Sequence, residues 1–445
     1  MNILIIDTDG VGLSFAWRSV QAGHKVKWFL ANKPCISKET GDGFKGIEKV
    51  DNFVPHMMWA DLVIPTSNDM FVERMDFFRK KGARIFGPTV ASANLEISRK
   101  AGMEIMKNHG IEVAPFETFK NMAEAAKHVE KSKDRFVFKT MGDNEDKALT
   151  YVSKDAADLL DWIDRIIDRK MEPKGEVMLQ TFIKGIEMGV SRFMGKDGFV
   201  GDWSESFEHK KVMSGNFGPN CGEAGTIAAF TEDSKLGKET LAKFEEELVK
   251  LGHTGDVAMG FMIPEDGEPR PTEWTCRLGW PIENMILGAT EGDPIEWMSD
   301  ALDGKDTVKF NREIGCCVVL HHGDFPHGNM DKKELSDVPI MGVTKGNKKY
   351  LHPQSVKIEI KRGMEQDEIV TRPTWTTTGD YIAVVTGFGK DVKQASERCY
   401  KTAGQIHVSN IGARDDVGEG MEEQLPKLHK LGYATHFEYD TGSKK

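Results

Sequence analysis

The sequence predicts an α/β protein that begins with a doubly wound parallel sheet and continues into mixed α+β modules. An apolar run from Asn2 to Ile6 is followed by a glycine-bearing turn, Asp7 to Gly12. A helical pattern then ends at Gly23, before a second apolar run from Val26 to Leu30, which is a βαβ beginning. The same alternation continues over roughly the first hundred residues, with strands expected at 61–65 and 84–86 and a helix at 70–81.

Helical and strand patterns alternate less regularly further along the chain, which predicts α+β modules. Apolar runs such as CCVVL, VKIEI and YIAVVTGF predict strands of a smaller C-terminal domain. The other expected elements are helices at 92–109, 122–131, 156–169, 234–251 and 392–406, and strands at 136–140, 148–153 and 176–181.

Length and composition bound the classes of function. A chain of 445 residues exceeds a single core and predicts two to four domains. With 59 Lys+Arg against 70 Asp+Glu, the net charge of -11 argues against broad binding to nucleic acid or to anionic membrane, although local basic stretches such as KGNKK stay open. The six cysteines have no CxxC spacing, which is typical of reduced cytosolic thiols: Cys35, Cys221, Cys276, Cys316, Cys317 and Cys399.

The N-terminus starts directly with a strand pattern and shows no basic leader or cleavage site. No apolar run approaches the roughly 20 residues that span a bilayer. We therefore expect a soluble, cytoplasmic protein without a membrane partner.

The run RPTEWTCRLGWP, from Arg270 to Pro281, places Glu273 and Arg277 among apolar and aromatic neighbours. An unpaired charge there would be costly, so each side chain needs a partner. A divalent cation for the carboxylate and an anion for the guanidinium would together form a nucleotide phosphate site. The alternative is a buried Glu–Arg ion pair.

A second run, HKKVMSGNFGPNCG, combines His209, Lys210 and Lys211 with an apparently flexible glycine-rich loop that ends at Gly222. Cations beside such a loop, with the Asn220 amide, suit an acyl phosphate or a carboxylate. The alternative is a charged surface stretch.

Lys139 ends the strand FVFKT, where a lysine can neutralise nucleotide phosphates; the alternative is a lysine on a solvent face. The loop that follows, MGDNEDKAL, carries Lys147 but also three acids, Asp143, Glu145 and Asp146. These acids would repel phosphate, so the loop is more typical of a solvated acidic turn.

The turn TDGVG carries Gly10 and Gly12 directly before a helix, although it lacks a full dinucleotide-binding pattern. A helix N-terminus at the end of a parallel strand suits a small anionic substrate, and the alternative is a simple tight turn.

Five motifs in one order resemble the phosphoribosylamine–glycine ligase (glycinamide ribonucleotide synthetase) family of the ATP-grasp superfamily. The resemblance covers nearly the whole chain, and TGDYIAVVTGFGKDVKQASERCYKTAGQIH and RDDVG extend it to the C-terminal part. The motifs are GPTVASANLEISRKAGMEIMKNHGI, FVFKT, EVMLQTFIKGIEMGVSRF, EHKKV…GPNCG and GFMI…RPTEWTCRLGWP.

The resemblance implies a Rossmann-like N-terminal domain at 1–100, a two-lobed ATP-grasp module, and a small α+β C-terminal domain at 311–445. The small ATP-grasp lobe, with its preceding helix, would cover 101–183, and the large lobe with the metal site 184–310. The implied cofactors are ATP and Mg²⁺, with Mn²⁺ as an alternative metal.

The resemblance also assigns roles to residues. The metal ligands would be Glu273 and, in place of the family's asparagine, Thr275. The catalytic residues would be Arg277, Lys210, His209 and Asn220. Contacts to ATP would come from Lys139, Lys147, Gln180, Thr181, Phe182 and Glu187, and substrate contacts from Gly10, Gly12, Asn220, Gly222 and Arg277.

Departures from the family pattern concentrate on the side that would bind ribose phosphate. The glycine-rich, arginine-bearing loop is DTDGVGL here, PTSNDM replaces a second glycine-bearing segment, and an expected C-terminal arginine is Asp380. Acid replaces neutral or positive character at these positions, which disfavours a phosphate.

We therefore expect an ATP- and Mg²⁺-dependent carboxylate–amine ligase that activates glycine or another small amino acid for an amine other than phosphoribosylamine. Its partners would be small molecules, and it would be a monomer or a homodimer. Three alternatives stay open at this point: the family's own phosphoribosylamine–glycine ligase reaction, ligation to a modified nucleobase, and a non-catalytic nucleotide-binding homologue.

Overall fold

The computed structural model describes residues 1–445 except 34–35, 142–148, 366–367 and 443–445. These residues divide into two compact units. One boundary falls at the start of helix α3 (Val90–Ile97), and the others fall inside or beside strands β9 (Ile186–Met194), β12 (Gly255–Ile263) and β13 (Arg270–Thr275). Unit 1 comprises Met1–Val90, Gly189–Ala258 and Cys276–Lys445, and unit 2 comprises Ala91–Met188 and Met259–Thr275. The four domains expected from the sequence stay a prediction.

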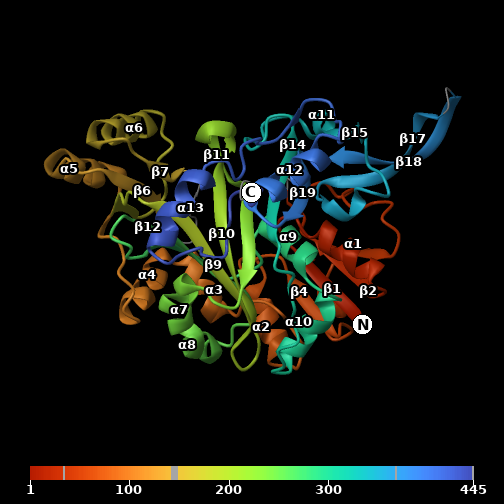
Figure 1. The fold of residues 1–445 in the computed structure, drawn as a ribbon, viewed down its shortest axis with the longest axis horizontal. Helices are drawn as coiled ribbons and strands as arrows, with labels where there is room; N and C mark the ends of the chain where they lie inside the picture. Colours follow the sequence, from red (N-terminus) through yellow and green to blue (C-terminus); the bar gives the residue numbers. More distant parts are fainter. Residues whose placement is uncertain (34–35, 142–148, 366–367, 443–445) are drawn as a thin grey trace. The chain divides into compact units, whose positions relative to one another are not determined.

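Unit 1 begins with a four-stranded sheet in the order β3-β2-β1-β4, and all of its pairings are parallel. Residues Ile3 to Ile6 of the central strand β1 are apolar and at most 1% exposed. A parallel sheet is covered on both faces, so its central strands are expected to be apolar on both sides. This confirms the predicted doubly wound beginning (Figure 1). The expected strand at 84–86 is reduced to a bridge between Val63 and Ile85. The elements are β1 (Asn2–Asp7), α1 (Leu13–Gln21), β2 (Lys25–Leu30), β3 (Ile47–Val50), β4 (Leu62–Pro65) and α2 (Val72–Arg79).

The larger sheet of unit 1 contains a long antiparallel hairpin made of β10 (Phe199–Met213) and β11 (Phe217–Thr231). The glycine-rich loop expected at 214–222 is therefore wrong beyond its first three residues, since Ser214–Asn216 form the turn and β11 begins at Phe217. Gly215 and Asn216 adopt left-handed backbone with φ of 67° and 59°, which a tight hairpin turn needs. The other glycines lie within β11, where the register with β10 is irregular, and this is a common place for glycine in a strand.

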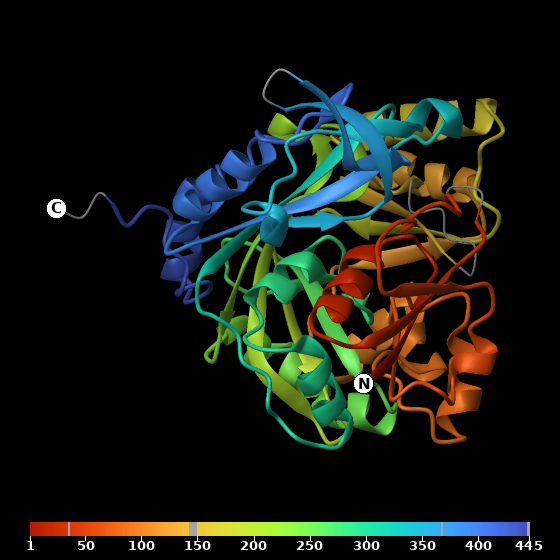
Figure 2. The same cartoon turned by 90° about the vertical axis from the view of Figure 1, so that its right-hand side faces the viewer.

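The sheet continues from this hairpin in the order β10-β11-β14-β19-β16, with β20 paired to β14. A separate three-stranded sheet has the order β15-β18-β17, and its strands β17 and β18 form a long hairpin (Figure 2). The strands are β14 (Ile314–His322), β15 (Ser336–Ile340), β16 (Leu351–Pro353), β17 (Val356–Glu365), β18 (Glu368–Thr378), β19 (Tyr381–Gly389) and β20 (Ile411–Gly412).

Helices cover the sheets of unit 1. A Cβ added at Gly387 would come within 2.6 Å of the Ala395 carbonyl oxygen, so β19 and α12 approach closely. The single helix expected at 234–251 is wrong, because Thr240 leaves the helical conformation (φ -125°, ψ -86°) and splits it into two short helices. The helices are α7 (Lys235–Glu239), α8 (Glu245–Lys250), α9 (Ile282–Ala289), α10 (Pro294–Leu302), α11 (Lys332–Leu335), α12 (Val392–Ala403) and α13 (Met421–Lys430).

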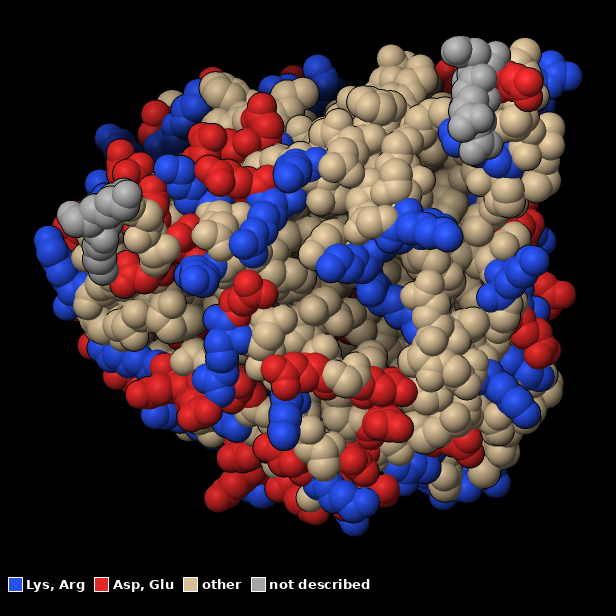
Figure 3. All heavy atoms as spheres, turned by 45° about the vertical axis from the view of Figure 1, so that its right-hand side comes forward, with Lys and Arg blue, Asp and Glu red and all other residues tan. Residues whose placement is uncertain are grey.

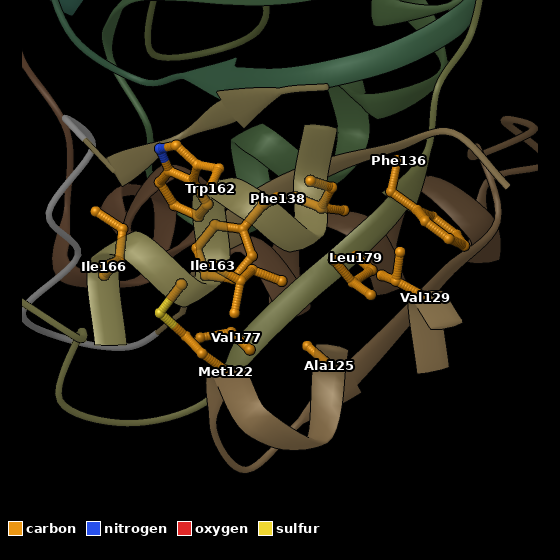
Figure 4. Packing of buried hydrophobic residues seen from close by; sticks show 11 residues of the cluster. Met122, Ala125, Val129, Phe136, Phe138, Trp162, Ile163, Ile166, Val177 and Leu179 are labelled. Carbon is orange, nitrogen blue, oxygen red and sulfur yellow. The ribbon is translucent and has the colours of Figure 1, made fainter. Parts of the chain in front are cut away.

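Unit 2 contains an antiparallel sheet in the order β5-β8-β6-β7 with two helices, α5 and α6, that share its core. Phe138 packs on Trp162 with ring centroids 5.0 Å apart, and Val129, Leu179 and Ile163 fill the same core (Figure 4). Amphipathic helices over a sheet bury the apolar side chains that their periodicity predicts. The elements are β5 (Phe116–Phe119), α5 (Met122–Ser132), β6 (Phe136–Thr140), β7 (Tyr151–Val152), α6 (Ala156–Asp168) and β8 (Val177–Thr181).

Two expectations for unit 2 need correction. The helix expected at 92–109 is two helices, α3 (Val90–Ile97) and α4 (Arg99–Asn108), because Ser98 is extended and its hydroxyl caps α4 by accepting the Ala101 N–H. Of the strand expected at 148–153, the structure shows β7 at Tyr151–Val152, and Ala148 lies outside the described residues.

Candidate active site

A hollow in unit 2 brings together charged residues from three elements. Glu96 at the end of α3, Arg99 at the start of α4 and Glu273 on β13 line it, together with Thr272 and with apolar side chains of α4. Glu273 belongs to an alternating strand in which Trp274 is buried and Glu273 is exposed. The alternation therefore presents a carboxylate to the hollow while its neighbour anchors the strand in the core.

Lys139 lies near the same strand. Its Nζ donates to the carbonyl oxygen of Thr272 at 3.3 Å, next to Glu273 in the chain. Arg99 donates to the carbonyl oxygen of Thr140 at 3.0 Å, one residue beyond Lys139. The ends of β6 and β13 and the start of α4 thus hold two cations close to the Glu273 strand, a combination that suits phosphates and a divalent cation.

The donor set fits magnesium bound to a nucleotide better than a metal held by protein alone. Within the described part of the chain, no group of three or more His, Cys, Asp or Glu side chains could hold a metal ion. Mg²⁺ commonly takes one or two carboxylates, with phosphate oxygens and water completing the shell. Glu273, with Thr275 at the end of β13, matches that pattern.

Gln180 supplies an unused hydrogen-bond donor. It lies on β8, is 5% exposed, and its Nε2 is buried without a hydrogen-bond partner among the described residues. A buried donor without an acceptor is costly, and a bound ligand with an acceptor atom would remove that cost. Next in the chain, the Thr181 N–H donates to the Pro115 carbonyl at 2.8 Å, so this segment is held by backbone bonds.

The other predicted nucleotide contacts are distributed along the same segment. The ring of Phe182 is covered by the guanidinium of Arg135 at 3.4 Å from its centroid, which leaves at most its other face for a base. Glu187 is exposed on β9. Lys147 and the acids Asp143, Glu145 and Asp146 lie outside the described residues.

The β10–β11 hairpin of unit 1 carries His209, Lys210, Asn220 and Gly222. Lys210 lies at an irregularity between two paired positions and forms an ion pair with Glu208. Asn220 is exposed opposite Lys211, and Gly222 has a φ of 82°. The hairpin therefore presents these side chains from a paired strand rather than from a mobile loop.

His209 is not a cation at neutral pH, which corrects the sequence interpretation of HKK as three positive residues. Its Nε2 accepts the Gly418 N–H at 3.3 Å. Burial and the nearby Arg414 guanidinium lower the pKa of His209 to about 4, with Asp416 opposing them. His209 is thus a neutral hydrogen-bond acceptor that ties the hairpin to the C-terminal part of unit 1.

Arg414 is the centre of that attachment. It is 1% exposed, and its guanidinium donates to the Lys211 carbonyl at 3.0 Å, to Asn216 Oδ1 at 2.8 Å and to both Asp416 oxygens. Asp416 also accepts the Gly215 N–H at 2.8 Å. Sequence reasoning quoted RDDVG only as part of the resemblance and missed this role.

Arg277 lies in unit 1 near two buried acids. Its Nη1 donates to the Leu278 carbonyl at 3.0 Å, and its charge lowers the pKa of Asp256. Burial nevertheless raises the pKa of Asp256 to about 7, and burial with the nearby Asp256 raises that of Glu283 well above its ordinary value. Both oxygens of Glu283 are buried without a hydrogen-bond partner among the described residues. Sequence reasoning singled out neither Asp256 nor Glu283.

The N-terminal loop is arranged around Asp7. Its carboxylate accepts the N–H groups of Asp9, Gly10 and Val11 on Oδ1, at 3.1, 2.9 and 3.3 Å, and that of Gly12 on Oδ2 at 2.8 Å. Thr66 Oγ1 and Trp28 Nε1 add donors at 3.0 and 3.2 Å. Burial raises the pKa of Asp7, while the bonds from Gly12, Asp9 and Thr66 lower it. The amides of Gly10 and Gly12, expected to face a substrate, therefore donate to the protein itself.

Apart from Arg277 and the segment from Gln180 to Glu187, the predicted residues that the structure describes fall into three places. Unit 2 brings Lys139 and Glu273 together and adds Arg99 and Glu96, which sequence reasoning missed although Arg99 directly follows the helix N-cap Ser98. Unit 1 holds the hairpin residues in one place and the Gly10–Gly12 loop in another.

The chain is similar to known proteins in sequence and in fold. Residues 98–282 match the model of the phosphoribosylglycinamide synthetase ATP-grasp (A) domain. A phosphoribosylamine–glycine ligase of Ralstonia nicotianae is 28% identical over 430 residues, covering 89% of this chain and 96% of the relative, and that of Vibrio cholerae is 26% identical over 437 residues, covering 94% and 98%.

Two solved structures show the same fold. The phosphoribosylamine–glycine ligase of Thermotoga maritima superposes with a TM-score of 0.69 at 19% identity, covering 94% of this chain and all of the other. An L-amino acid ligase of Bacillus licheniformis gives 0.56 at 15% identity, covering 92% and 98%.

Fold and sequence matches together define an ATP-grasp ligase that forms a C–N bond. Within that class, the chain resembles the phosphoribosylamine–glycine ligases along most of its length, at 28% identity or less. Among the described residues, no helix has both the length and the hydrophobicity needed to cross a membrane.

Proposed function

We propose that this carboxylate–amine ligase uses ATP and Mg²⁺ to activate glycine or another small amino acid and joins it to an amine other than phosphoribosylamine. A carboxylate is a poor electrophile until one oxygen becomes a leaving group. Transfer of the ATP γ-phosphoryl group to a carboxylate oxygen makes an acyl phosphate and releases ADP. Attack of the amine nitrogen on the acyl carbon then forms the amide, with loss of phosphate and a proton.

The observation that carries the ligase proposal is the grouping of Lys139 and Arg99 with the exposed carboxylate of Glu273 in unit 2. Bound ATP would supply the phosphoryl group, and magnesium would neutralise charge on it. Lys139 and Arg99 would hold phosphate oxygens, and Glu273 with Thr275 would hold the metal. The unused Gln180 donor would bind the base, with Glu187 on the ribose.

On the substrate side, Arg277, Lys210 and Asn220 would hold the acyl phosphate or the amino-acid carboxylate. Arg277 offers a guanidinium suited to two oxygens, and Asn220 is exposed on the hairpin. His209 would position the hairpin rather than carry charge, because its Nε2 already accepts the Gly418 N–H. We also place the enzyme in the cytoplasm, as a monomer or homodimer.

A coupled assay tests the proposal. Purified protein is incubated with ATP, Mg²⁺, a panel of amino acids and a panel of amines, and ADP and amide product are measured. Glu273→Gln should lose most of the activity, whereas Glu265→Gln, an exposed glutamate on the turn before β13, should retain it. The absence of amide product above the Glu273→Gln background with every pair would contradict the ligase proposal.

The family's own reaction is the second candidate, and full-length similarity to phosphoribosylamine–glycine ligases favours it. Growth of a purine auxotroph that lacks this ligase, when the chain is expressed, would support this candidate. Expression without growth would support the different amine.

A further inference from the structure

The loop between β1 and α1 has the geometry of an anion site. Four consecutive backbone N–H groups, from Asp9 to Gly12, converge at the end of a parallel strand and the start of a helix. Such convergent amides, with the positive end of the helix dipole, are a general means of binding phosphate. In this chain the anion at that position is the protein's own Asp7 carboxylate.

We infer that Asp7 is a specificity-determining residue: it occupies the anion position of this loop, so the acceptor amine meets the loop with an uncharged group and not with a phosphate. This inference rests on the proposed ligase function. It also makes that proposal more specific, because it states that the part of the acceptor that meets this loop carries no phosphate.

The loop is closed around Asp7 by six donors, four backbone amides with Thr66 and Trp28. Asp7 is 0% exposed at the end of the rigid central strand β1, so it has no free direction in which to move aside. A Cβ added at Gly12 would lie 2.9 Å from Asp7 Oδ2, which shows how tightly the turn is drawn around the carboxylate. A phosphate would have to displace a saturated, buried carboxylate.

Charge at the mouth of the loop acts in the same direction. Asp9 adds a second carboxylate, and its Oδ1 accepts from Lys33 Nζ at 2.9 Å, so this nearby cation already has an anionic partner. A phosphate at the loop would therefore face two carboxylates of like sign, one of them buried where screening is weak.

The test compares ribose 5-phosphate with ribose, a matched pair that differs only in the phosphate. Binding of each is measured by calorimetry to the wild type, to Asp7→Gly, to the near-isosteric Asp7→Asn, and to Asp51→Asn as an exposed control. All titrations contain Mg²⁺ and a saturating non-hydrolysable ATP analogue. The analogue occupies the nucleotide site, so that ribose 5-phosphate cannot bind there. Circular dichroism reports whether each variant folds.

We expect the wild type and Asp51→Asn to bind ribose 5-phosphate no more tightly than ribose. A folded Asp7→Gly, or Asp7→Asn if the glycine variant does not fold, should gain at least 10-fold in affinity for ribose 5-phosphate and nothing for ribose. Tighter binding of ribose 5-phosphate than ribose by the wild type would overturn the inference without any variant. So would folded Asp7 variants that show no gain.

Activity provides a separate arm. Ribose 5-phosphate with ammonia forms 5-phosphoribosylamine in equilibrium, and ribose with ammonia forms the unphosphorylated amine, so both acceptors can be offered with glycine, ATP and Mg²⁺. Faster amide formation with the phosphorylated acceptor overturns the role of Asp7. If no amide forms with any acceptor, the ligase proposal fails, and the binding comparison still decides whether Asp7 excludes phosphate.

Discussion

The hollow of unit 2 and the N-terminal loop of unit 1 both contain groups that suit phosphate, but they use them in opposite ways. In unit 2, Glu273 is exposed at a hollow, and Lys139 and Arg99 lie beside its strand. In unit 1, the loop amides turn inward and bind Asp7. The difference teaches that one chain can present charged side chains at an open hollow while the protein's own carboxylate satisfies the backbone amides of another segment.

The charge of the chain as a whole is acidic. On the face drawn in Figure 3, Lys and Arg side chains alternate with Asp and Glu and with uncharged residues, and the chain as a whole carries a net charge of -11. Such mixed charge does not favour a polyanionic partner. Small uncharged or cationic acceptors therefore agree better with the surface as well as with the loop.

The comparison makes a first, large prediction. Lys139→Ala should lower kcat/KM for ADP formation by about 100- to 1000-fold, equivalent to roughly 3–4 kcal/mol, because a cation at transferring phosphates stabilises charge in the transition state. The free energy of unfolding should change little, since a 3.3 Å bond from Nζ to the Thr272 carbonyl contributes little to stability.

The measurement pairs steady-state kinetics with urea unfolding, and Lys131→Ala, an exposed lysine on α5, is the control. A Lys139→Ala variant that loses stability but keeps its kcat/KM would show that Lys139 has a structural role and no role in phosphoryl transfer.

Arg414→Ala should show the opposite profile, a loss of stability of about 3 kcal/mol. The buried guanidinium bridges Lys211, Asn216 and Asp416, and its removal leaves the Asp416 carboxylate without its main partner. Urea unfolding measures the loss, with the exposed Arg362→Ala as the control. Unchanged stability would show that the hairpin does not depend on this attachment.

The acids beside Arg277 predict a pH dependence. Burial raises the pKa of Asp256 from 3.8 to about 7 and that of Glu283 well above 4.5. In the unfolded chain both groups lose their protons near their ordinary pKa, so between pH 4 and 7 the unfolded state binds fewer protons and stability falls as pH rises. Asp256→Asn and Glu283→Gln should remove part of this fall.

We expect each variant to be more stable than the wild type by about 1–3 kcal/mol at pH 7.5, and equal to it at pH 4. Urea unfolding across this pH range is the measurement, and Asp300→Asn, which changes a partly exposed acid of α10, is the control. A larger difference at pH 4 than at pH 7.5 would contradict the assignment.

Much of the fold, but less of the site, could be predicted from the sequence. Residues 2–6, 136–140 and 156–169 have periodic apolar patterns that local physics converts directly into a buried strand, an alternating strand and an amphipathic helix. The run after His209 was misinterpreted because glycines that permit a tight turn and strand irregularities have the same composition as a loop.

Long-range contacts account for the rest. The Asp7 carboxylate, which accepts the amides of Gly10 and Gly12, also accepts hydrogen bonds from Thr66 and Trp28. The charge of His209 depends on its burial beside Arg414. None of these neighbours is close in sequence to the residue that it affects. Local patterns therefore predict which groups are present, while the fold decides whether they face a ligand or each other.

The smallest expected effect concerns His209. Its substitution tests whether this residue of the hairpin takes part in catalysis or only accepts a structural hydrogen bond. With a pKa near 4, His209 stays neutral from pH 5.5 upward and acts as an acceptor for the Gly418 N–H. His209→Gln keeps an acceptor oxygen, so kcat/KM should stay within about threefold of the wild type, and the pH–rate profile should keep its shape from pH 5.5 to 8. Exposed His327→Gln is the control. A loss of 100-fold or more in kcat/KM, or a change in the acidic limb of the pH–rate profile, would show that His209 is a catalytic group. The hairpin would then contribute to the reaction, as we propose for the residues of the hollow.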